Sequence, residues 1–272
     1  MSEDSRPDLV LVVESDYFLP LAGGSLALDR HDPMNAYFVG PLTGLGLPHV
    51  FHLPNPPALG VTLLATYLRR QGLDVAVLAN VFRLARERER FFAMLERRPL
   101  AVGISTTFMH SPESVARIAG WVRERSPGTK VLLGGFRAWR KEEVRALGDV
   151  TVLGEGEKTL LDLMSALRRG EAWEHVPNLV WRSGGRWASS ARQANFTLAE
   201  RLPPDWELLG MRSTHCYGVE ASRGCTHTCA FCAYPNDANQ QMMLRPVEDV
   251  VAELKRDREK YGITLKIGRA HV

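Results

Sequence analysis

The chain has 272 residues, of which 45% are hydrophobic, and its formal net charge is +3. A chain of this length and apolar content can bury the core of one large domain or of two modest ones. No apolar run approaches the length of a membrane-spanning helix, and the charge is too small to argue for nucleic acid. We therefore expect neither a membrane nor a nucleic acid as a partner.

Five short apolar runs alternate with helical patterns in the first part of the chain. The runs are rich in valine and leucine and show no polar alternation, which is typical of strands buried on both faces of a parallel sheet. They are Leu9 to Val13, Val75 to Leu78, Ala101 to Ile104, Val131 to Leu133 and Val150 to Leu153.

Amphipathic stripes between these runs predict helices that begin at a capping residue or end at a glycine. The stripes are Leu63, Leu64, Tyr67 and Leu68 before Gly72; Val115, Ile118, Ala119 and Val122 after Ser111 and Pro112; and Leu160, Leu161, Met164 and Leu167 before Gly170. This alternation of strands and helices predicts an α/β fold with an N-terminal doubly wound, Rossmann-like parallel sheet.

Small and polar residues directly follow three of these strands. Doubly wound sheets bind ligands outside the carboxyl ends of their strands. Glycines there let the backbone approach a ligand or turn tightly, and hydroxyls offer hydrogen bonds. Taken singly, a glycine after a strand is more often an ordinary turn. The candidate cofactor-binding residues are Ser105, Thr106, Gly134, Gly135, Gly154, Glu155 and Gly156.

A second structural unit is expected to begin near residue 195. Pro177 to Trp181 and Arg186 to Ala188 flank Ser183-Gly-Gly185, which is a hairpin pattern, and a polar linker with Pro203-Pro204 follows. Beyond it the sequence predicts a strand, a cysteine loop, a helix and the start of another strand. These are Tyr217 to Ala221, the loop after it, the stripe Val247, Val250, Val251, Leu254 and Tyr261 before Gly262, and Ile263 with Leu265.

Three of the four cysteines stand as Cys225-Thr-His-Thr-Cys229-Ala-Phe-Cys232. A four-iron cluster normally takes four cysteines, so three on one short loop would leave one iron open to a small molecule. The alternative is zinc, completed by Cys216, although structural zinc sites usually pair two separated knuckles. A disulfide framework is disfavoured, because four cysteines and no N-terminal apolar signal segment suit a reducing cytoplasm.

The residues around these cysteines, Ala221-Ser-Arg-Gly-Cys225 through Phe231-Cys232, resemble the signature of the radical S-adenosylmethionine (SAM) enzymes. The resemblance implies that Cys225, Cys229 and Cys232 hold a [4Fe-4S] cluster whose open iron is chelated by SAM. It also implies a β/α barrel, of which this chain holds the opening, and an electron donor of the flavodoxin or ferredoxin type.

The same resemblance suggests roles for the neighbours of the cysteines. Phe231 is expected to pack near the SAM adenine or the cluster, with simple core packing as an equal alternative. Arg223 and Gly224 are expected to shape the loop. Arg245 could contact a SAM carboxylate, but a surface ion pair is the favoured reading.

The run from Pro57-Ala-Leu-Gly through Val102-Gly-Ile-Ser105, Leu133-Gly-Gly135 and Leu153-Gly-Glu-Gly-Glu157 looks like the cobalamin-binding domain that precedes the barrel in one large group of radical SAM enzymes. Cobalamin is therefore an implied cofactor. Stand-alone cobalamin domains carry an Asp-x-His-x-x-Gly motif, whereas Asp29-Arg-His31-Asp-Pro-Met34 lacks the glycine and does not directly follow the first strand. His31 is thus read as a surface histidine.

The resemblance implies a radical SAM enzyme that cleaves SAM reductively and uses cobalamin to transfer a methyl group to an unactivated carbon. A rearrangement or cyclisation without methyl transfer, and a non-catalytic cofactor-binding fragment, stay open as alternatives. A methylthiotransferase is disfavoured because it would need three further cysteines, and none precedes Cys216. The substrate, a small molecule or a peptide, and the catalytic residues are not assigned.

The last six residues, Ile267-Gly-Arg-Ala-His-Val272, can be encoded by ATC GGA AGA GCA CAC GTC, the start of a widely used sequencing adapter. We expect them to be an artefact. The expected organisation is a cobalamin-binding-like domain with an N-terminal extension over 1–195, the start of a radical SAM core over 196–266, and the artefact over 267–272. Such a chain is expected to be inactive alone, while its sheet, ending near Ala191, would fold independently.

Overall fold

The computed structural model describes residues 6–14, 58–109, 111–193, 201–209, 216–227, 242–263 and 265–270. In these residues the strands form a seven-stranded sheet of order β2-β1-β3-β4-β5-β6-β7 and a three-stranded sheet of order β10-β8-β9. None of the described helices is long and apolar enough to cross a membrane.

The five predicted apolar strands are confirmed and form the parallel part of the large sheet. They are β1 (Leu9–Val13), β2 (Val75–Ala79), β3 (Ala101–Ser105), β4 (Lys130–Gly134) and β5 (Val150–Val152). The predicted hairpin is also confirmed, and it extends the same sheet by two antiparallel strands. These are β6 (Leu179–Ser183) and β7 (Arg186–Ser189), joined by a turn in which Gly184 and Gly185 take positive φ.

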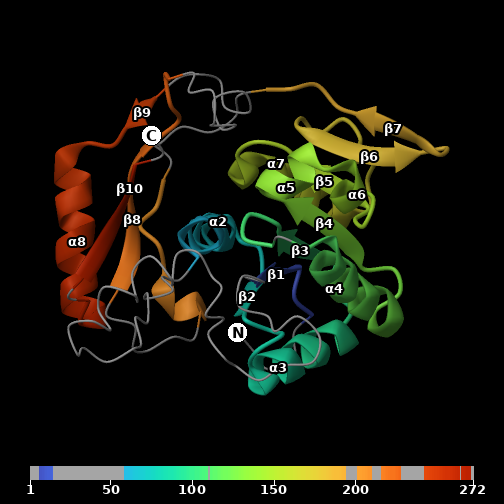
Figure 1. The fold of residues 1–272 in the computed structure, drawn as a ribbon, viewed down its shortest axis with the longest axis horizontal. Coiled ribbons are helices and arrows are strands. Elements are labelled where there is room, and N and C mark those ends of the chain that lie inside the picture. The colour runs from blue at the N-terminus through green and yellow to red at the C-terminus, as the bar shows by residue number, and fades with distance from the viewer. Residues whose placement is uncertain are drawn as a thin grey trace, which may run out of the picture.

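Helices cover both faces of the large sheet (Figure 1). One face carries α2 (Leu59–Arg70) and α7 (Gly156–Arg169), and the other carries α3 (Ala85–Glu96) and α4 (Pro112–Arg125). Two short helices, α5 (Phe136–Arg140) and α6 (Glu142–Arg145), follow β4. The predicted doubly wound arrangement is therefore confirmed.

Alternation along the strands fills the two cores. In β1, Leu9 and Leu11 belong to the core that includes Leu63 and Leu68 of α2. Val10 and Val12 belong to the opposite core, which includes side chains of α3 and α4. Because successive side chains of a strand point to opposite faces, an unbroken apolar run is what a strand covered on both sides requires.

The winding of the chain reverses at β1. The chain passes from β1 through α2 to β2, then crosses back through α3 to β3 on the other side of β1, and β3 pairs in parallel with β1. Reversals of this kind leave a crevice at the carboxyl ends of the two central strands, where ligands of such folds bind.

The second sheet is built on a parallel β-α-β unit. It comprises β8 (Cys216–Arg223), α8 (Val247–Tyr261) and β10 (Leu265–Ala270), with the short β9 (Met243–Leu244) antiparallel to the end of β8. The predicted helix stop is confirmed, since Gly262 takes φ 66° after α8. Strand β10 extends into residues 267–270, which the sequence reading assigned to an adapter-encoded tail.

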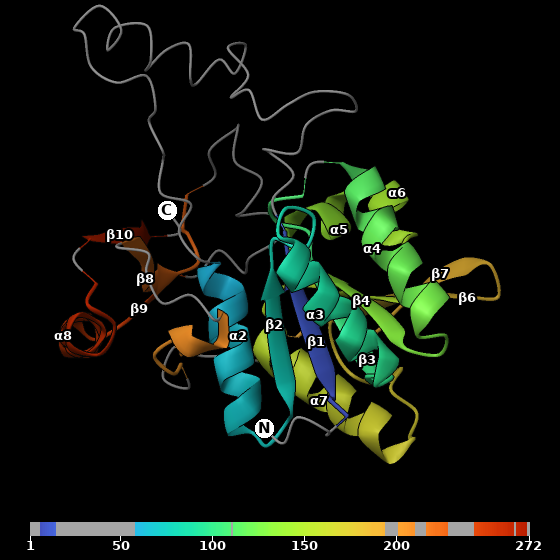
Figure 2. The ribbon, with the colours of Figure 1, turned by 90° about the horizontal axis from the view of Figure 1, so that it is seen from below.

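The two sheets share a hydrophobic core around α2, which lies between them (Figures 1 and 2). The short helix η3 (Trp206–Leu209) inserts Trp206, whose ring meets Tyr217 of β8 edge to face at 4.6 Å. A Cβ at Gly218 of β8 would come 3.2 Å from Leu59 of α2. The expected boundary at residue 195 lies outside the described residues, but the parts on either side of it are joined by buried apolar surface.

Candidate functional site

A cavity of about 240 Å³ lies on the face of the large sheet that α2 and α7 cover. It reaches from the crevice between β1 and β3 to the carboxyl ends of β4 and β5, which is where doubly wound folds bind ligands. Its walls are mostly aliphatic, with hydroxyls at one end. The lining includes Leu11, Leu64, Leu132, Val152 and Leu160, together with Ser105 and Thr107.

The cavity exists because small residues stand where the sheet would otherwise present large ones. Gly103, Ser105, Gly134 and Gly154 all line it, near or beyond the carboxyl ends of their strands. A Cβ built on Gly134 or on Gly154 would meet no atom within 4 Å. Gly134 and Gly154 therefore border open space that a larger side chain would fill.

Five of the seven candidate cofactor-binding residues line this cavity, namely Ser105, Gly134, Gly135, Gly154 and Gly156. Thr106 is completely buried behind them. Its hydroxyl donates to the Gly134 carbonyl at 2.8 Å and accepts from the Ala138 N–H at 3.0 Å. The side chain of Thr106 thus fixes the turn after β4.

Gly135 completes that turn with a φ of 92°. A Cβ at this position would come 2.5 Å from the Thr107 hydroxyl and 2.9 Å from the Thr107 backbone nitrogen. Since L side chains rarely adopt this φ and the space is occupied, the turn requires glycine. The loops after β3 and β4 therefore pack directly against each other at the mouth of the cavity.

The cysteine loop begins where β8 ends. Gly224 turns the chain with φ 90°, and Cys225 is 3% exposed, with its sulfur accepting from the His227 N–H at 3.4 Å. Cys229, Cys232 and Phe231 lie outside the described residues, as does His31. Among the residues that are described, no three Cys, His, Asp or Glu side chains stand close enough to hold a metal ion.

The backbone of β8 argues against the four-cysteine zinc site. Cys216 is the first residue of β8, paired with Leu265 of β10, and Cys225 lies two residues beyond the last. Because a strand rises about 3.3 Å per residue, the two cysteines are about 20 Å or more apart. Sulfur ligands lie only about 2.3 Å from their zinc, so one ion cannot bind both.

Arg223 links the cysteine strand to the loop that borders the cavity. Its guanidinium donates twice to the Glu220 carboxylate of β8, each time at 3.1 Å, and once to Glu157 of α7 at 2.9 Å. The side chains of Arg223, Glu220 and Glu157 are 10%, 6% and 9% exposed. Burial alone would lower the pKa of Arg223, but Glu157 and Glu220 raise it above its usual value.

The ion pairs continue from Glu220 into α8. Arg201 pairs with Glu220 at 2.9 Å and with Glu253 at 2.8 Å, and Arg245 pairs with Glu253 at 3.1 Å. Burial would raise the pKa of Glu220, yet Arg223 and Arg201 hold it below its usual value. Three arginines thus face three carboxylates, including Glu157, in what we name the arginine network.

The prediction that Arg245 forms an ion pair at the surface is wrong. The Arg245 side chain is 6% exposed, and besides Glu253 it bonds the Glu220 carbonyl at 2.7 Å. Neither Glu220 nor Glu157 was among the site residues predicted from the sequence. The carboxylate of Glu220 in the middle of the mostly apolar run from Tyr217 to Ala221 was the one available signal for a buried ion pair.

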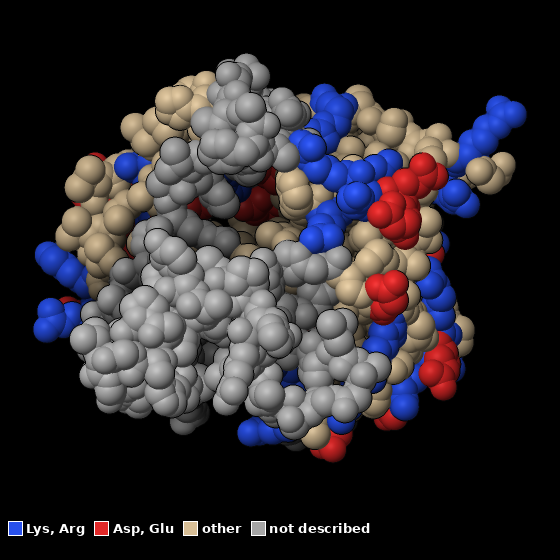
Figure 3. All heavy atoms as spheres, viewed as in Figure 1, with Lys and Arg blue, Asp and Glu red and all other residues tan. Residues whose placement is uncertain are grey.

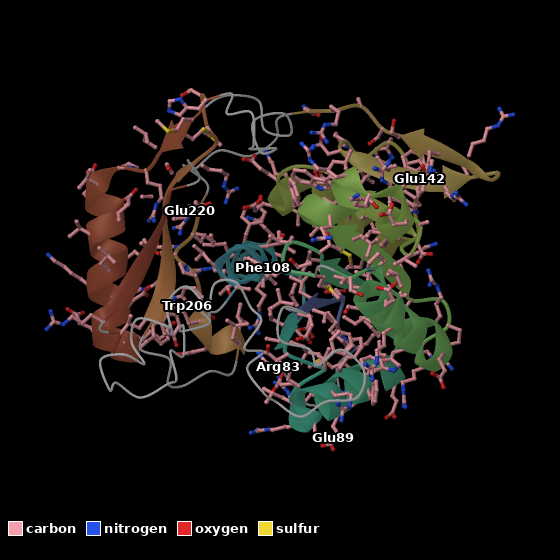
Figure 4. The ribbon with its side chains drawn as sticks, in the orientation of Figure 1. Arg83, Glu89, Phe108, Glu142, Trp206 and Glu220 are labelled. Carbon is pink, nitrogen blue, oxygen red and sulfur yellow. The ribbon has the colours of Figure 1, made fainter. Side chains whose placement is uncertain are left out.

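Glu155 lies at the edge of the arginine network, 3.9 Å from Arg223, with its side chain 29% exposed. Burial raises the pKa of Glu155 to about 7, although Arg223 opposes the shift and Glu157 and Glu220 add to it. The three arginines and three carboxylates of the network already balance in charge, so the carboxylate of Glu155 gains little electrostatic stabilisation from them. Figure 3 shows acidic side chains near the centre of this face of the molecule. In Figure 4, Glu220 and Trp206 both lie between α8 and α2.

Comparison with known proteins identifies the domain family that most of the large sheet matches. Residues 54–164 match the B12 binding domain family, and this stretch contains the cavity-lining residues Ser105, Gly134, Gly135, Gly154 and Gly156. The chain is also 26% identical over 242 residues to an uncharacterised methyltransferase of Pyrococcus horikoshii. That alignment covers 85% of this chain and 52% of the relative.

Two further relatives have assigned activities. The chain is 28% identical over 210 residues to cytidylyl-2-hydroxyethylphosphonate methyltransferase of Streptomyces wedmorensis, which covers 62% of this chain and 39% of the relative. It is 26% identical over 216 residues to hopanoid C-3 methylase of Methylococcus capsulatus, and that alignment covers 74% of this chain and 40% of the relative. The chain thus spans about half or less of the length of these relatives.

Solved structures share the fold over nearly the whole chain. The radical SAM methyltransferase TsrM of Kitasatospora setae, with tryptophan and a SAM analogue bound, matches with a TM-score of 0.63 at 18% identity, covering 96% of this chain and 47% of that protein. The cobalamin-dependent radical SAM enzyme OxsB, with aqua-cobalamin and SAM bound, matches with a TM-score of 0.66 at 17% identity, covering 97% and 34%. The chain thus combines a match to the B12 binding domain family over residues 54–164 with the fold of the radical SAM enzymes TsrM and OxsB over nearly its whole length.

Proposed function

We propose that this chain supplies the cobalamin site and the cluster loop of a cobalamin-dependent radical SAM methyltransferase. The observation that carries the proposal is the cavity at the winding reversal, whose open space is made by glycines within the stretch that matches the B12 binding domain. Residues 196–266 would open the radical SAM barrel that follows, with β8, α8 and the beginning of β10 as its first elements.

The cavity would take up only one part of cobalamin. Cobalamin is far larger than about 240 Å³, so only a flat and largely apolar portion of the cofactor would enter between the aliphatic walls. Gly134 and Gly154 would let the backbone approach the ligand closely, and the hydroxyls of Ser105 and Thr107 would offer hydrogen bonds. The sequence places no histidine directly after β1, so we expect no histidine ligand to cobalt.

The cluster would be held by Cys225, Cys229 and Cys232. The burial of Cys225 and the N–H that His227 directs at its sulfur suit a thiolate ligand, because hydrogen bonds to sulfur tune such clusters. When bound, the cluster and cobalamin supply reductive SAM cleavage and a methyl group for an unactivated carbon, while the protein orients them and excludes water. An electron donor of the flavodoxin or ferredoxin type would be the partner, and the substrate is a small molecule or a peptide.

The cavity proposal is tested by filling the cavity. Gly134→Leu would place a side chain in the cavity, because a Cβ built on Gly134 meets no atom within 4 Å. The variant should therefore abolish hydroxocobalamin binding, as measured by absorbance titration. Gly120→Leu is the matched control, since Gly120 is exposed on α4, away from the cavity, and has equally open surroundings. This control should bind as the wild type does.

Two results would oppose the cavity assignment. Unchanged binding in Gly134→Leu would show that cobalamin sits elsewhere. Absence of binding in the wild type at micromolar cofactor would favour a radical SAM reaction without methyl transfer. Circular dichroism melts of both variants separate a filled cavity from a lost fold.

A further inference from the structure

We propose that Arg223 and Glu157 form a latch that couples the cluster loop to the cobalamin cavity, so that loading one cofactor site strengthens binding at the other. This proposal rests on the proposed function, because it assigns the two sites to those cofactors. Arg223 and Glu157 are positioning residues in it: neither is a ligand of the cluster or part of the cavity lining.

The latch joins the two sites through very few bonds. On one side, Arg223 is the last residue of β8 and only Gly224 separates it from Cys225. On the other side, Glu157 directly follows Gly156, a cavity-lining residue at the start of α7. The hydrogen bond of 2.9 Å from Arg223 Nη1 to Glu157 Oε1 therefore joins residues 66 positions apart in the sequence. It connects the start of the cysteine loop to the end of the Gly154–Gly156 loop.

The guanidinium has little freedom to move independently of the cysteine strand. Glu220, three residues earlier on β8, holds its Nε and its Nη2, and the carbonyl of Glu220 is itself fixed by Arg245. A planar fork bonded on two edges transmits a shift of its strand to the third bonded group. The third group here is the Glu157 carboxylate.

Coupling follows from this geometry. A cluster bound at Cys225 would fix the backbone after Arg223, and the ion pair would in turn fix Glu157 and the Gly154–Gly156 loop in front of the cavity. A loop that is already ordered costs less to order on binding, so cobalamin should bind more tightly to the cluster-loaded protein. Thermodynamic reciprocity requires the cluster to gain by the same factor.

The test compares hydroxocobalamin dissociation constants for iron-free and anaerobically reconstituted protein. In the wild type we expect cluster loading to tighten binding by about fivefold or more, the lower range of typical allosteric coupling. Glu157→Gln keeps the size of the side chain and a hydrogen-bond acceptor but removes the charge. It should bring the ratio of the two constants close to one.

Glu87→Gln is the matched control. Glu87 is a partly buried carboxylate, with its side chain 17% exposed, and it pairs with Arg90 of α3 at 2.8 Å outside the arginine network. The variant loses the same charge and should keep the wild-type ratio. If Glu157→Gln folds poorly, Glu157→Asp replaces it, because aspartate keeps the charge and shortens the reach, and a reduced ratio is then expected.

The outcomes separate the latch from the function. A wild type that takes up neither cobalamin nor iron contradicts the proposed function. A wild type that binds both with no coupling, or a Glu157 variant that keeps the full coupling, overturns the latch and leaves the function standing. Loss of coupling in Glu87→Gln as well would show a general effect of removing a paired carboxylate, which also overturns the latch.

Discussion

At the scale of single residues, the motif Gly154-Glu-Gly-Glu157 has two different uses. Its glycines border the cavity, whereas Glu157 bonds Arg223, and Glu155 stands partly exposed at the edge of the arginine network. The sequence could place the glycines near a ligand because their position after a strand is a local signal. It could not pair Glu157 with Arg223, since an ion pair between distant segments depends on how the two sheets pack.

Glu155 gives a pH prediction at this scale. Burial raises the pKa of Glu155 from the ordinary 4.5 to about 7, so the folded protein holds this proton more tightly than the unfolded chain does. The free energy of unfolding should therefore lose this contribution as the pH rises through that interval. Glu155→Gln should remove the loss and make the protein relatively more stable at about pH 8, as measured by urea unfolding.

The control for Glu155 is Glu124→Gln, which changes an exposed carboxylate of α4. This variant should show the same pH dependence as the wild type. If the Glu155 variant also followed the wild-type curve, the raised pKa of Glu155 would be contradicted.

At the scale of elements, the sequence predicted the main strands and helices but not α5, α6 or β9, and not the order of the strands in the sheet. The five apolar runs, the three stripes and the hairpin turn are local patterns, and each is confirmed. The position of β1 between β2 and β3, which creates the crevice and hence the cavity, depends on long-range pairing. The helix η3 was missed because four residues carry no periodic pattern.

Trp206 of η3 gives a prediction at the element scale. Its indole is 1% exposed, packs on Tyr217 and donates to the Asp257 carboxylate at 3.3 Å. Trp206→Ala should cost about 3–5 kcal/mol in the free energy of unfolding, because it leaves a large cavity between the sheets. Chemical denaturation measures this. Leu84→Ala, at a half-exposed residue, should cost far less, and a similar loss in both variants would contradict the role of Trp206.

At the scale of the whole molecule, the structure shows that one of the two hydrophobic cores is shared by both parts of the chain, where the sequence suggested two separate units. The core around α2 includes Leu59 and Leu63 from the first part and Trp206, Tyr217 and Ile263 from the second. The sequence could not reveal this, because a polar linker reads as a boundary whether or not the flanking parts pack together.

A piece ending at residue 193 tests that shared core. The large sheet keeps both of its internal cores, so the piece should still melt cooperatively, as the sequence suggested. It should also bind a hydrophobic dye and melt at a lower temperature than the full chain, because the outer side of α2 loses its cover. An equal melting temperature and no dye binding would contradict the shared core.

The most direct test of the central claim, that one chain brings a cobalamin site and a cluster loop together, is the cofactor content of the anaerobically reconstituted protein. We predict one cobalamin and about four irons per chain, with iron lost in the serine variants of Cys225, Cys229 or Cys232 but retained in Cys216→Ser. Stoichiometric zinc that requires Cys216, or iron uptake without any cobalamin, would contradict the account.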